Sequence, residues 1–389
     1  MRKMMNILHI TGQQTSEKIG GLEKWYAFFV ASANKNGWGE VFLIFSKETP
    51  KEPVAAFFVN NNVKTAVFDY RFSIANFLKF HSYLRRNQIQ FLHCHFENTL
   101  WFLVAGKLLG MKTFWHLNME NYYSVNNDWK NNFKVRVGVT FYRLKIFMLQ
   151  FFIDKIYCAS YAVQREYRDF FKLFSRKLEV TYFGLPKSQI DAEKARRRSF
   201  DRTAKSRIII GCVAFHAPVK GVDILLRAVN VLVERGHDVE LLQIGGSQFI
   251  HDKHDTKSLH DLAVELGLTD RINWAGIQQN VTDCLLDVDI YCQPSRHEAL
   301  SFSIMEAMTI SLPIVATNVG GIPEVVQNGI NGFVFPPDDH VKCADKIEEL
   351  ILKTALRHEM GNRSLEIIDS PIFYTENTIE LIQKNYDKG

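Results

Sequence analysis

Two patterns of apolar residues alternate along most of the chain. Short apolar runs, which are typical of buried strands, are separated by longer segments in which apolar residues recur every three or four positions, as on one face of a helix. In the first half we predict strands at 6–10, 41–46, 89–96, 112–117 and 155–160. Strands that alternate with helices in this way are typical of a parallel sheet of Rossmann type.

Two of the predicted helices are defined clearly by their apolar spacing. The first carries a face made of Leu22, Trp25, Tyr26, Phe29 and Ala33, and the second carries a face made of Val222, Leu225, Leu226, Val229, Leu232 and Val233. A glycine follows each face, Gly37 in one case and Gly236 in the other. Glycine at that place is a common helix end, so both segments are predicted to stop there.

The strand and helix alternation starts again after residue 206. We predict further strands at 207–215, 239–246, 272–276, 290–295 and 313–317. A chain of 389 residues is too long for one ordinary core, so two domains are expected. The predicted fold class is α/β, with two Rossmann-like, doubly wound domains that face a central cleft.

The domain boundaries follow from changes in composition. Residues 187–206 are charged and poor in apolar side chains, which favours a linker between an N-terminal domain at 1–186 and a C-terminal domain at 207–371. The tail at 372–389 is amphipathic. We predict that it forms a helix that packs back on the N-terminal domain.

Composition narrows the possible partners. Hydrophobic residues make up 47% of the chain and charged residues 23%, as in ordinary globular proteins. The net charge of +5 is too small to predict nucleic-acid binding, but it is compatible with anionic ligands or an anionic membrane. The six cysteines form no Cys-x-x-Cys pair, which favours reduced thiols in a cytoplasmic protein.

Nothing in the sequence predicts a signal peptide or a membrane span. The apolar run at 6–10 is too short for the first, and no uninterrupted apolar run reaches the ~18 residues that the second needs. A membrane role would therefore be peripheral, on the inner face. Residues 128–152 mix Lys and Arg with aromatic side chains, which leaves open a contact with an anionic membrane surface or an ordinary amphipathic helix with a solvated charged face.

The stretch SRHEALSFSIMEAM at 295–308 carries the strongest chemical signal. It follows a predicted strand and leads into a helix that would begin near Ser301. Amide N–H groups at a helix start lack internal partners and suit a diphosphate. Glu298 just before the helix and Glu306 within it can accept hydrogen bonds from sugar hydroxyls. The spacing alone is a weak signal, and the alternative is a helix-capping glutamate and a solvated one.

The run QPSRHEALSFSIMEAMTISLPIVATNVGGIPEVVQNGINGFVFPPDD resembles the donor domain of the retaining glycosyltransferases of family 4, which have the GT-B fold and include sucrose synthases and bacterial mannosyltransferases. The resemblance implies that Glu298 contacts the donor sugar and that Glu306 holds the ribose. It also implies that the backbone of Leu300, Ser301 and Phe302 receives phosphate. Ala299 and Ser301 stand where this family usually has glycine.

Two further segments of the second half resemble the same family. FHAPVKGVDILLRAV implies that Lys220 neutralises the diphosphate leaving group. An arginine usually precedes this lysine, so either His216 substitutes for it in part or the phosphate is held more weakly. LLQIGGSQ and WAGIQQNV imply backbone contacts to the base from Gly245, Gly276 and Ile277. The alternatives are a surface lysine at a helix start and ordinary turn glycines.

The first half resembles the family more loosely. KIGGLEKW implies that Gly20 and Gly21 approach the donor phosphate, and TFWHLNME implies that His116 reaches the transferred sugar. A buried strand histidine is the alternative for His116. The two histidines of HCHF lie on one face of a strand, but no further ligand spacing follows, so we predict no metal site.

The resemblance implies a retaining glycosyltransferase with His116, Lys220 and Glu298 as catalytic residues. It would move a sugar from a nucleotide-diphosphate sugar, most often a UDP-sugar, to a hydroxyl of a glycan or lipid-linked acceptor in cell-surface polysaccharide or glycolipid synthesis. No cofactor, metal or nucleic acid is expected. Two alternatives stay open: a non-catalytic nucleotide-sugar-binding subunit, and an epimerase or phosphorylase on the GT-B fold.

Overall fold

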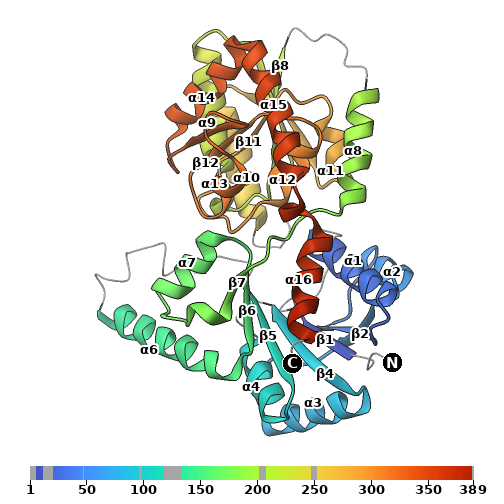
Figure 1. Ribbon diagram of the computed structural model, residues 1–389. Helices are drawn as coiled ribbons and strands as arrows, with labels where there is room; N and C mark the ends of the chain where they lie inside the picture. Colours follow the sequence, from blue (N-terminus) through green and yellow to red (C-terminus); the bar gives the residue numbers. More distant parts are fainter. Residues whose placement is uncertain are drawn as a thin grey trace. The chain divides into compact units, whose positions relative to one another are not determined.

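In a computed structural model the chain folds into two α/β units (Figure 1). The structure describes residues 6–11, 21–46, 48–95, 99–117, 133–200, 207–246 and 252–387. The first unit comprises Met1–Phe183 and Thr375–Gly389, and the second comprises Gly184–Tyr374. Within the described ranges, no helix is both long and apolar enough to cross a bilayer.

The first unit is built on a parallel sheet with the strand order β3-β2-β1-β4-β5-β6-β7. Its strands are β1 (Asn6–Ile10), β2 (Val41–Phe45), β3 (Lys64–Val67), β4 (Ile89–His95), β5 (Lys112–Leu117), β6 (Lys155–Cys158) and β7 (Leu178–Val180). Its helices are α1 (Gly21–Lys35), α2 (Val54–Asn60), α3 (Ile74–Arg86), α4 (Leu100–Leu108), α6 (Phe133–Leu149), α7 (Tyr161–Asp169) and α16 (Thr375–Asp387), with short 3₁₀ turns η3 (Gln150–Phe152) and η4 (Ser175–Lys177).

The second unit has a parallel sheet with the strand order β10-β9-β8-β11-β12-β13. Its strands are β8 (Ile208–Val213), β9 (Val239–Ile244), β10 (Ile272–Gly276), β11 (Ile290–Gln293), β12 (Ile314–Thr317) and β13 (Gly332–Phe335). Its helices are α8 (Lys187–Ser199), α9 (Val222–Glu234), α10 (Asp252–Glu265), α11 (Val281–Leu285), α12 (Phe302–Thr309), α13 (Ile322–Val325), α14 (His340–Leu352) and α15 (Thr354–Ile368), with 3₁₀ turns η5 (Pro218–Lys220), η6 (Thr269–Arg271) and η7 (Pro371–Phe373).

The predicted fold class of two Rossmann-like domains is confirmed, because the order of strands in both sheets reverses direction at β1 or β8 as in doubly wound folds. The two helices predicted from apolar spacing are α1 and α9. Gly37 and Gly236 follow them with φ of 69° and 87°, the left-handed conformation that commonly ends a helix.

The prediction missed three strands, each of which is short and lies at the edge of its sheet. Strand β3 lies at the edge of its sheet, and three of its four residues are exposed. Strand β7 has only three residues. Strand β13 begins with a glycine, Gly332, whose added Cβ would lie 1.8 Å from the carbonyl oxygen of Ile314.

The prediction of a linker at 187–206 is wrong for most of its length, because residues 187–199 form helix α8 within the second unit. Ile190 is its only buried side chain, so the segment shows no apolar stripe. Polar contacts dock the helix instead. Arg197 donates from Nη1 to the carbonyl of Leu286 at 2.9 Å, and Glu193 accepts from the Thr282 hydroxyl at 2.9 Å. A hydrophobic pattern cannot reveal a helix that is held in this way.

The chain passes between the units at 183/184 and at 374/375, about three residues from each predicted boundary. The second unit includes both crossing segments because they pair with each other. Leu185 donates its amide N–H to the carbonyl of Phe373 at 3.0 Å. A Cβ at Gly184 would lie 1.8 Å from the same oxygen, so only glycine permits this approach.

Helix α16 belongs to the first unit, where it packs against α1 (Figure 1). Its Tyr386 is almost fully buried, with ring centroids 4.8 Å from Phe91 and 4.7 Å from Phe114. The Tyr386 hydroxyl also lies 3.0 Å from Nδ1 of His93, in strand β4. One tyrosine thus joins the last helix of the chain to the centre of the first sheet.

We predict that Tyr386→Phe destabilises the first unit by about 1–3 kcal/mol, because the buried Nδ1 of His93 loses its hydrogen-bond partner while packing is kept. Thermal and urea unfolding would measure the change. Lys384→Gln, an exposed change on the same helix, is the control and should have little effect. Equal stability of the Tyr386 variant and the unmodified protein would contradict this role.

Candidate functional site

A glycine holds the turn after β8 close to the end of β11. Gly221 follows η5 with φ of 66°, a left-handed conformation that favours glycine. A Cβ atom at this position would lie 2.0 Å from the carbonyl oxygen of Pro294. Only glycine therefore lets the turn that carries Lys220 approach the residues that follow β11.

That approach brings Lys220 and Glu298 together. The Lys220 Nζ donates to Oε2 of Glu298 at 2.7 Å, and the two side chains are 26% and 13% exposed. A partly sheltered pair attracts more strongly than one in open solvent. An ammonium group and a carboxylate thus lie side by side beyond the carboxyl ends of β8 and β11, the edge where open α/β sheets bind ligands.

Arg296 joins the segment after β8 to the loop after β11 at a second point. Sequence reasoning did not identify this residue. Its guanidinium makes paired bonds of 2.9 and 2.8 Å to Asp223 in α9 and a 2.7 Å bond from Nε to Asp338. Hydrogen bonding to Asp223 is the main reason that the pKa of Arg296 is raised. The signal was an arginine two positions before Glu298 and an aspartate three positions after Lys220.

Helix α12 begins where the loop that carries Glu298 ends. The Oγ of Ser301 caps it by accepting the amide N–H of Ile304 at 3.4 Å, one of the four N–H groups that a helix start leaves without helical partners. Ser301 has φ of −92° and ψ of 113°, which any residue adopts. Serine in place of the expected glycine therefore costs no backbone strain. Leu300 is buried beside it, and Phe302 is half-buried.

Buried hydrogen bonds support the start of α12 from below. The side-chain oxygen of Gln293, the last residue of β11, accepts from the Tyr291 hydroxyl at 2.7 Å and from the Ser303 hydroxyl at 3.2 Å. The amide nitrogen of Gln293 donates to the Ser295 hydroxyl at 2.9 Å. Burial raises the pKa of Tyr291 well above its ordinary value, so its hydroxyl remains a donor.

Glu306 lies in the second turn of α12 and is half-buried. It is near enough to Tyr291 to contribute to the raised pKa of that phenol. The other glutamate is held by its backbone as well as by Lys220, since the carbonyl of Glu298 accepts the amide N–H of Gly321 at 3.2 Å. The structure therefore brings Lys220, Glu298, the start of α12 and Glu306 to one edge of one sheet.

The glycines expected near the base meet at the neighbouring strand ends. The amide N–H of Gly245 donates to the carbonyl of Gly276 at 2.8 Å. Gly245 has φ of 125°, and a Cβ there would lie 2.0 Å from the carbonyl oxygen of Ala214. Ile277 follows Gly276 and is 46% exposed. Close backbone packing explains the first glycine, whereas no described atom lies within 4 Å of a Cβ at Gly276.

The structure does not support His216 as a substitute for the arginine. Its Nδ1 lies 2.8 Å from the Thr256 hydroxyl, and its Nε2 lies 2.9 Å from the side-chain oxygen of Gln243. The ring is also buried edge-on against Trp274. Both ring nitrogens thus have partners within the unit, so the histidine in this conformation joins α10 to β9 and offers no nitrogen to a phosphate.

The structure gives a different result for the site residues predicted in the first unit. Gly20 lies outside the described residues, and Gly21 is the first residue of α1. His116 stands at the carboxyl side of β5 as expected, but it has no exposed surface. Its Nε2 lies 3.2 Å from the Thr181 hydroxyl, and its ring stacks on Phe183 with centroids 4.2 Å apart. In this conformation it is a buried strand histidine, and its role toward a sugar stays a prediction.

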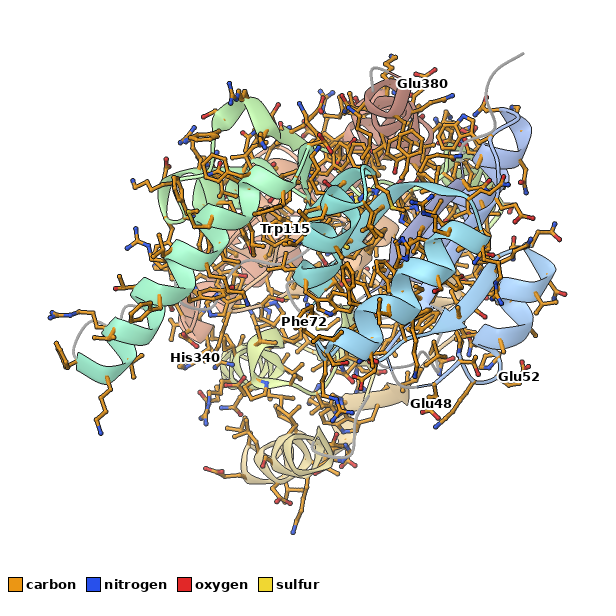
Figure 2. All side chains as sticks on the ribbon, turned by 90° about the horizontal axis from the view of Figure 1, so that it is seen from below. Glu48, Glu52, Phe72, Trp115, His340 and Glu380 are labelled. Atoms are coloured by element: carbon orange, nitrogen blue, oxygen red, sulfur yellow. The ribbon has the colours of Figure 1, made fainter. Side chains whose placement is uncertain are left out.

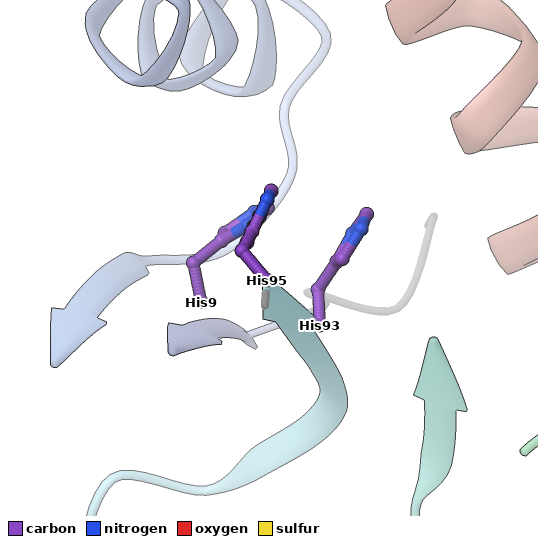
Figure 3. Close-up of side chains that lie close together, drawn as sticks. All are labelled: His9, His93 and His95. Carbon is purple, nitrogen blue, oxygen red and sulfur yellow. Dashed lines mark hydrogen bonds between the residues drawn. The ribbon is translucent and has the colours of Figure 1, made fainter. Parts of the chain in front are cut away.

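His116 belongs to a row of four fully buried histidines on one face of the sheet; Figure 3 shows the other three, His9, His93 and His95. The strand register pairs His9 with His93 and His95 with His116. The rings of His93 and His95 stack with centroids 4.8 Å apart, and Nδ1 of His9 lies 3.1 Å from Nε2 of His95. Sequence spacing revealed only one pair, because the register creates the rest.

Burial keeps this row neutral. It lowers the pKa of His9 from 6.5 to about 3. It also lowers the pKa values of His93, His95 and His116 well below the ordinary value, with a smaller contribution from the neighbouring rings. Neutral rings can share protons as donors and acceptors and can stack, which charged rings at these distances would oppose.

The row raises the question of a metal ion, because one ligand nitrogen from each of His9, His93 and His95 lies within 4.8 Å of the others. Zn–N bonds of about 2.0–2.1 Å place two nitrogens on one Zn²⁺ at most about 4.2 Å apart, so the rings would have to draw together. Two of the ring nitrogens also pair with each other, since Nδ1 of His9 lies 3.1 Å from Nε2 of His95. We therefore assign no metal to them.

Comparison with known proteins finds a family match within the second unit. Residues 193–366 match the family described as glycosyl transferases group 1. The second unit belongs to this family. One relative is the N-acetyl-alpha-D-glucosaminyl L-malate synthase of Bacillus anthracis, 28% identical over 44% of this chain and 43% of the relative. Another is the capsular polysaccharide biosynthesis glycosyltransferase CapM of Staphylococcus aureus, 27% identical over 50% of this chain and 51% of the relative.

The chain spans about half the length of the curated relatives that it matches. Solved structures extend the likeness of fold to both units. Anabaena Alr3699/HepE in complex with UDP and glucose has a TM-score of 0.78 at 18% identity, over 99% of this chain and 100% of that one. A sucrose-phosphate synthase from Thermosynechococcus elongatus has a TM-score of 0.77 at 16% identity, over 99% and 98%. At such identities the likeness concerns the fold.

We predict that Gly221→Ala destabilises the group 1 domain far more than Gly329→Ala. Both glycines have positive φ, so both substitutions cost about 1–2 kcal/mol in backbone strain. A Cβ at Gly329 meets open space, whereas one at Gly221 meets the Pro294 carbonyl, which adds about 1–3 kcal/mol. Thermal unfolding of both variants measures the difference. Equal losses would show that the close approach does not matter.

We predict that the histidine row makes the first unit sensitive to acid. The unfolded chain takes up protons near pH 6.5 that the native rings refuse until far lower pH. Stability is therefore complete above about pH 6.5 and falls as the pH decreases, by up to about 1.4 kcal/mol per pH unit for each proton. Urea unfolding between pH 7.5 and 5 tests this. His9→Asn should give a shallower slope, and a flat profile in the unmodified protein would contradict neutral burial.

Proposed function

We propose that the protein transfers a sugar from a nucleotide-diphosphate sugar to an acceptor hydroxyl, with retention of configuration. The observation that carries the proposal is the Lys220–Glu298 pair at the carboxyl edge of the second sheet, 2.7 Å apart beside the start of α12. Membership of the second unit in group 1 supports it. UDP is the expected nucleotide, because HepE has been solved with UDP and glucose and the pneumococcal O-GlcNAc transferase GtfA with UDP and GlcNAc.

In the proposed complex the diphosphate lies between the ammonium of Lys220 and the amide N–H groups at the start of α12. It replaces Glu298 as the partner of Lys220, which frees that carboxylate to accept hydrogen bonds from the sugar hydroxyls. Glu306 accepts from the ribose diol, and the backbone near Gly245 and Ile277 borders the base. Two negative phosphates suit this place because one ammonium and one helix start face it together.

The proposed reaction needs no protein nucleophile. The bond between the anomeric carbon and the diphosphate oxygen breaks while the acceptor oxygen bonds to the same face of that carbon. The acceptor proton passes to the departing phosphate, whose growing charge Lys220 and the helix start stabilise. His116 is left out of this step because of its burial. The chemistry also asks for no metal, because the lysine and the amides supply the positive field.

The acceptor is proposed to be a hydroxyl of a glycan or of a lipid-linked glycan. Two relatives of this chain are named for such syntheses: CapM for capsular polysaccharide and LpsE of Rhizobium meliloti for the lipopolysaccharide core. Both names describe those proteins. They favour a role of this chain in cell-surface polysaccharide or glycolipid synthesis, with the donor drawn from the cytoplasm.

A second candidate is a subunit that binds the nucleotide sugar without turning it over. It is favoured by one observation, that neither Phe215 nor His216 offers the cation that usually precedes Lys220. Phe215 is apolar, and His216 is bonded at both ring nitrogens. Lys220 would then be the one side-chain cation proposed at the diphosphate, which suits binding better than catalysis.

We predict that Lys220→Ala and Glu298→Gln each lower the rate of sugar transfer from the productive donor by about 10²–10³, because each removes a charge that faces the reacting groups. The assay incubates the protein with a panel of nucleotide sugars and follows free nucleotide and transfer product. Lys353 and Glu349 form a matched control, a pair 2.9 Å apart in the same unit with side chains 59% and 29% exposed, whose Ala and Gln variants should keep full activity.

The assay separates the candidates. Turnover in the unmodified protein with losses confined to the site variants supports the transferase. Tight UDP binding without turnover of any donor supports the binding subunit. Unchanged activity in both site variants would rule out the proposed site.

A further inference from the structure

Helix α6 of the first unit has two apolar faces, and only one of them packs on the unit. Val139, Ile146 and Gln150, which follows in η3, are buried with exposures of 2%, 0% and 0%. At about 100° per residue these three positions lie within about 40° of one another around the axis. This narrow stripe is the face by which α6 packs on the rest of the first unit.

A second apolar stripe faces solvent on the opposite side. In the order of the chain its members and their exposures are Phe133 71%, Val137 39%, Phe141 68%, Leu144 54%, Met148 50% and Phe151 51%. Their spacing of three and four residues keeps all of them within about 80° around the helix axis, centred about 160° from the buried stripe. Figure 2 shows α6, in green at the left, with side chains projecting around it. A helix of this kind escapes a simple amphipathic test because its two apolar faces oppose each other.

An exposed apolar stripe of this length is unusual on a helix face that contacts only water. Scattered exposed apolar residues are ordinary on protein surfaces, but a contiguous row marks a place of contact. We call Phe133, Val137, Phe141, Leu144, Met148 and Phe151 the outer stripe. The question is which partner covers it.

The charges beside the outer stripe indicate the partner. Every charged residue between 133 and 152 is basic: Lys134, Arg136, Arg143 and Lys145. Arg143 is held inward, since it donates to the carbonyl of Phe170 at 2.9 Å. Lys134 and Lys145 are exposed on one flank of the stripe, and Arg136 is exposed on the other, with its guanidinium 5.7 Å from the ring centre of Phe133.

An apolar row flanked by cations on both sides has the chemistry of a helix that lies in a membrane interface. The apolar side chains reach the acyl boundary, while the Lys and Arg side chains extend to anionic headgroups. A second copy of this chain is a poorer match. Pairing the outer stripe with itself about a two-fold axis would bring two rows of the same charge together.

We propose that the outer stripe of α6 docks on the surface of an anionic lipid bilayer and lies along its headgroup boundary. The inference goes beyond the proposed function, because binding to lipid requires neither a donor nor turnover. It also favours one of the two interpretations of residues 128–152, which are contact with an anionic membrane and an ordinary amphipathic helix. The membrane is favoured because the outer stripe lies opposite the face that packs on the unit.

The test measures co-flotation of the full chain with vesicles of phosphatidylcholine alone and of phosphatidylcholine with phosphatidylglycerol. We expect binding to the anionic vesicles to be at least tenfold tighter than to the neutral ones, and to weaken as salt is added. The triple variant Phe141→Ser, Leu144→Ser, Met148→Ser should lose at least tenfold in binding. Lys134→Glu, Arg136→Glu, Lys145→Glu should lose the preference for anionic lipid.

The matched control is Ile74→Ser with Leu78→Ser, since these two side chains on α3 of the same unit are 76% and 57% exposed. It should bind vesicles as the unmodified protein does. All variants change exposed side chains, and circular dichroism melting checks that they fold. Failure of the unmodified protein to float with anionic vesicles at low salt would overturn the proposal, as would unchanged binding by the triple variant. A dimer in solution that the triple variant dissolves would assign the stripe to a second copy instead.

Discussion

The candidate site of the second unit depends on one contact between backbones. Gly221 passes so close to Pro294 that a side-chain carbon would lie 2.0 Å from the proline carbonyl. Through this contact the turn after β8 and the loop after β11 become one surface, with Lys220 from the first beside Glu298 from the second. Arg296 reinforces the contact through Asp223. The charged pair is therefore positioned by packing rather than by its own attraction, which by itself is modest for a pair that is partly exposed.

The first unit differs from the second in that it buries a row of polar histidine rings. Four histidines on three adjacent strands share one fully buried face, and a tyrosine from the far end of the chain supplies a partner to one of them. Such a core is stable because the rings stay neutral, stack and hydrogen-bond, so no charge has to be buried. The same arrangement includes His116. What the family resemblance implied as a catalytic group is, in this structure, part of a core.

Sequence reasoning predicted the elements whose apolar pattern repeats. It did not predict features that depend on a single contact. The apolar periods of α1 and α9 were predictable, because burial imposes their spacing. The central strands of both sheets were predictable for the same reason. Helix α8 was missed because polar contacts rather than an apolar stripe hold it. The two motifs around Lys220 and Glu298 located Lys220, Glu298 and Glu306 at one sheet edge. The sequence shows Arg296 beside Glu298, but not that this arginine bonds two aspartates that are distant in the sequence.

The histidine row and the partners of His216 could not be predicted from the sequence for a related reason. The type and position of these residues were visible in the sequence, but their partners were not. Register between strands brought His9 to His93, and packing of α10 gave His216 its threonine. Whether a histidine is a ligand or a core residue depends on the groups that its two nitrogens meet.

The central claim is that the second unit binds a diphosphate where Lys220 meets the start of α12. A crystal structure of the full chain with UDP tests it most directly. The account predicts that the pyrophosphate lies against the Lys220 ammonium and the amides near Ser301, with the ribose toward Glu306. A pyrophosphate bound far from residues 220 and 298–306 would contradict it.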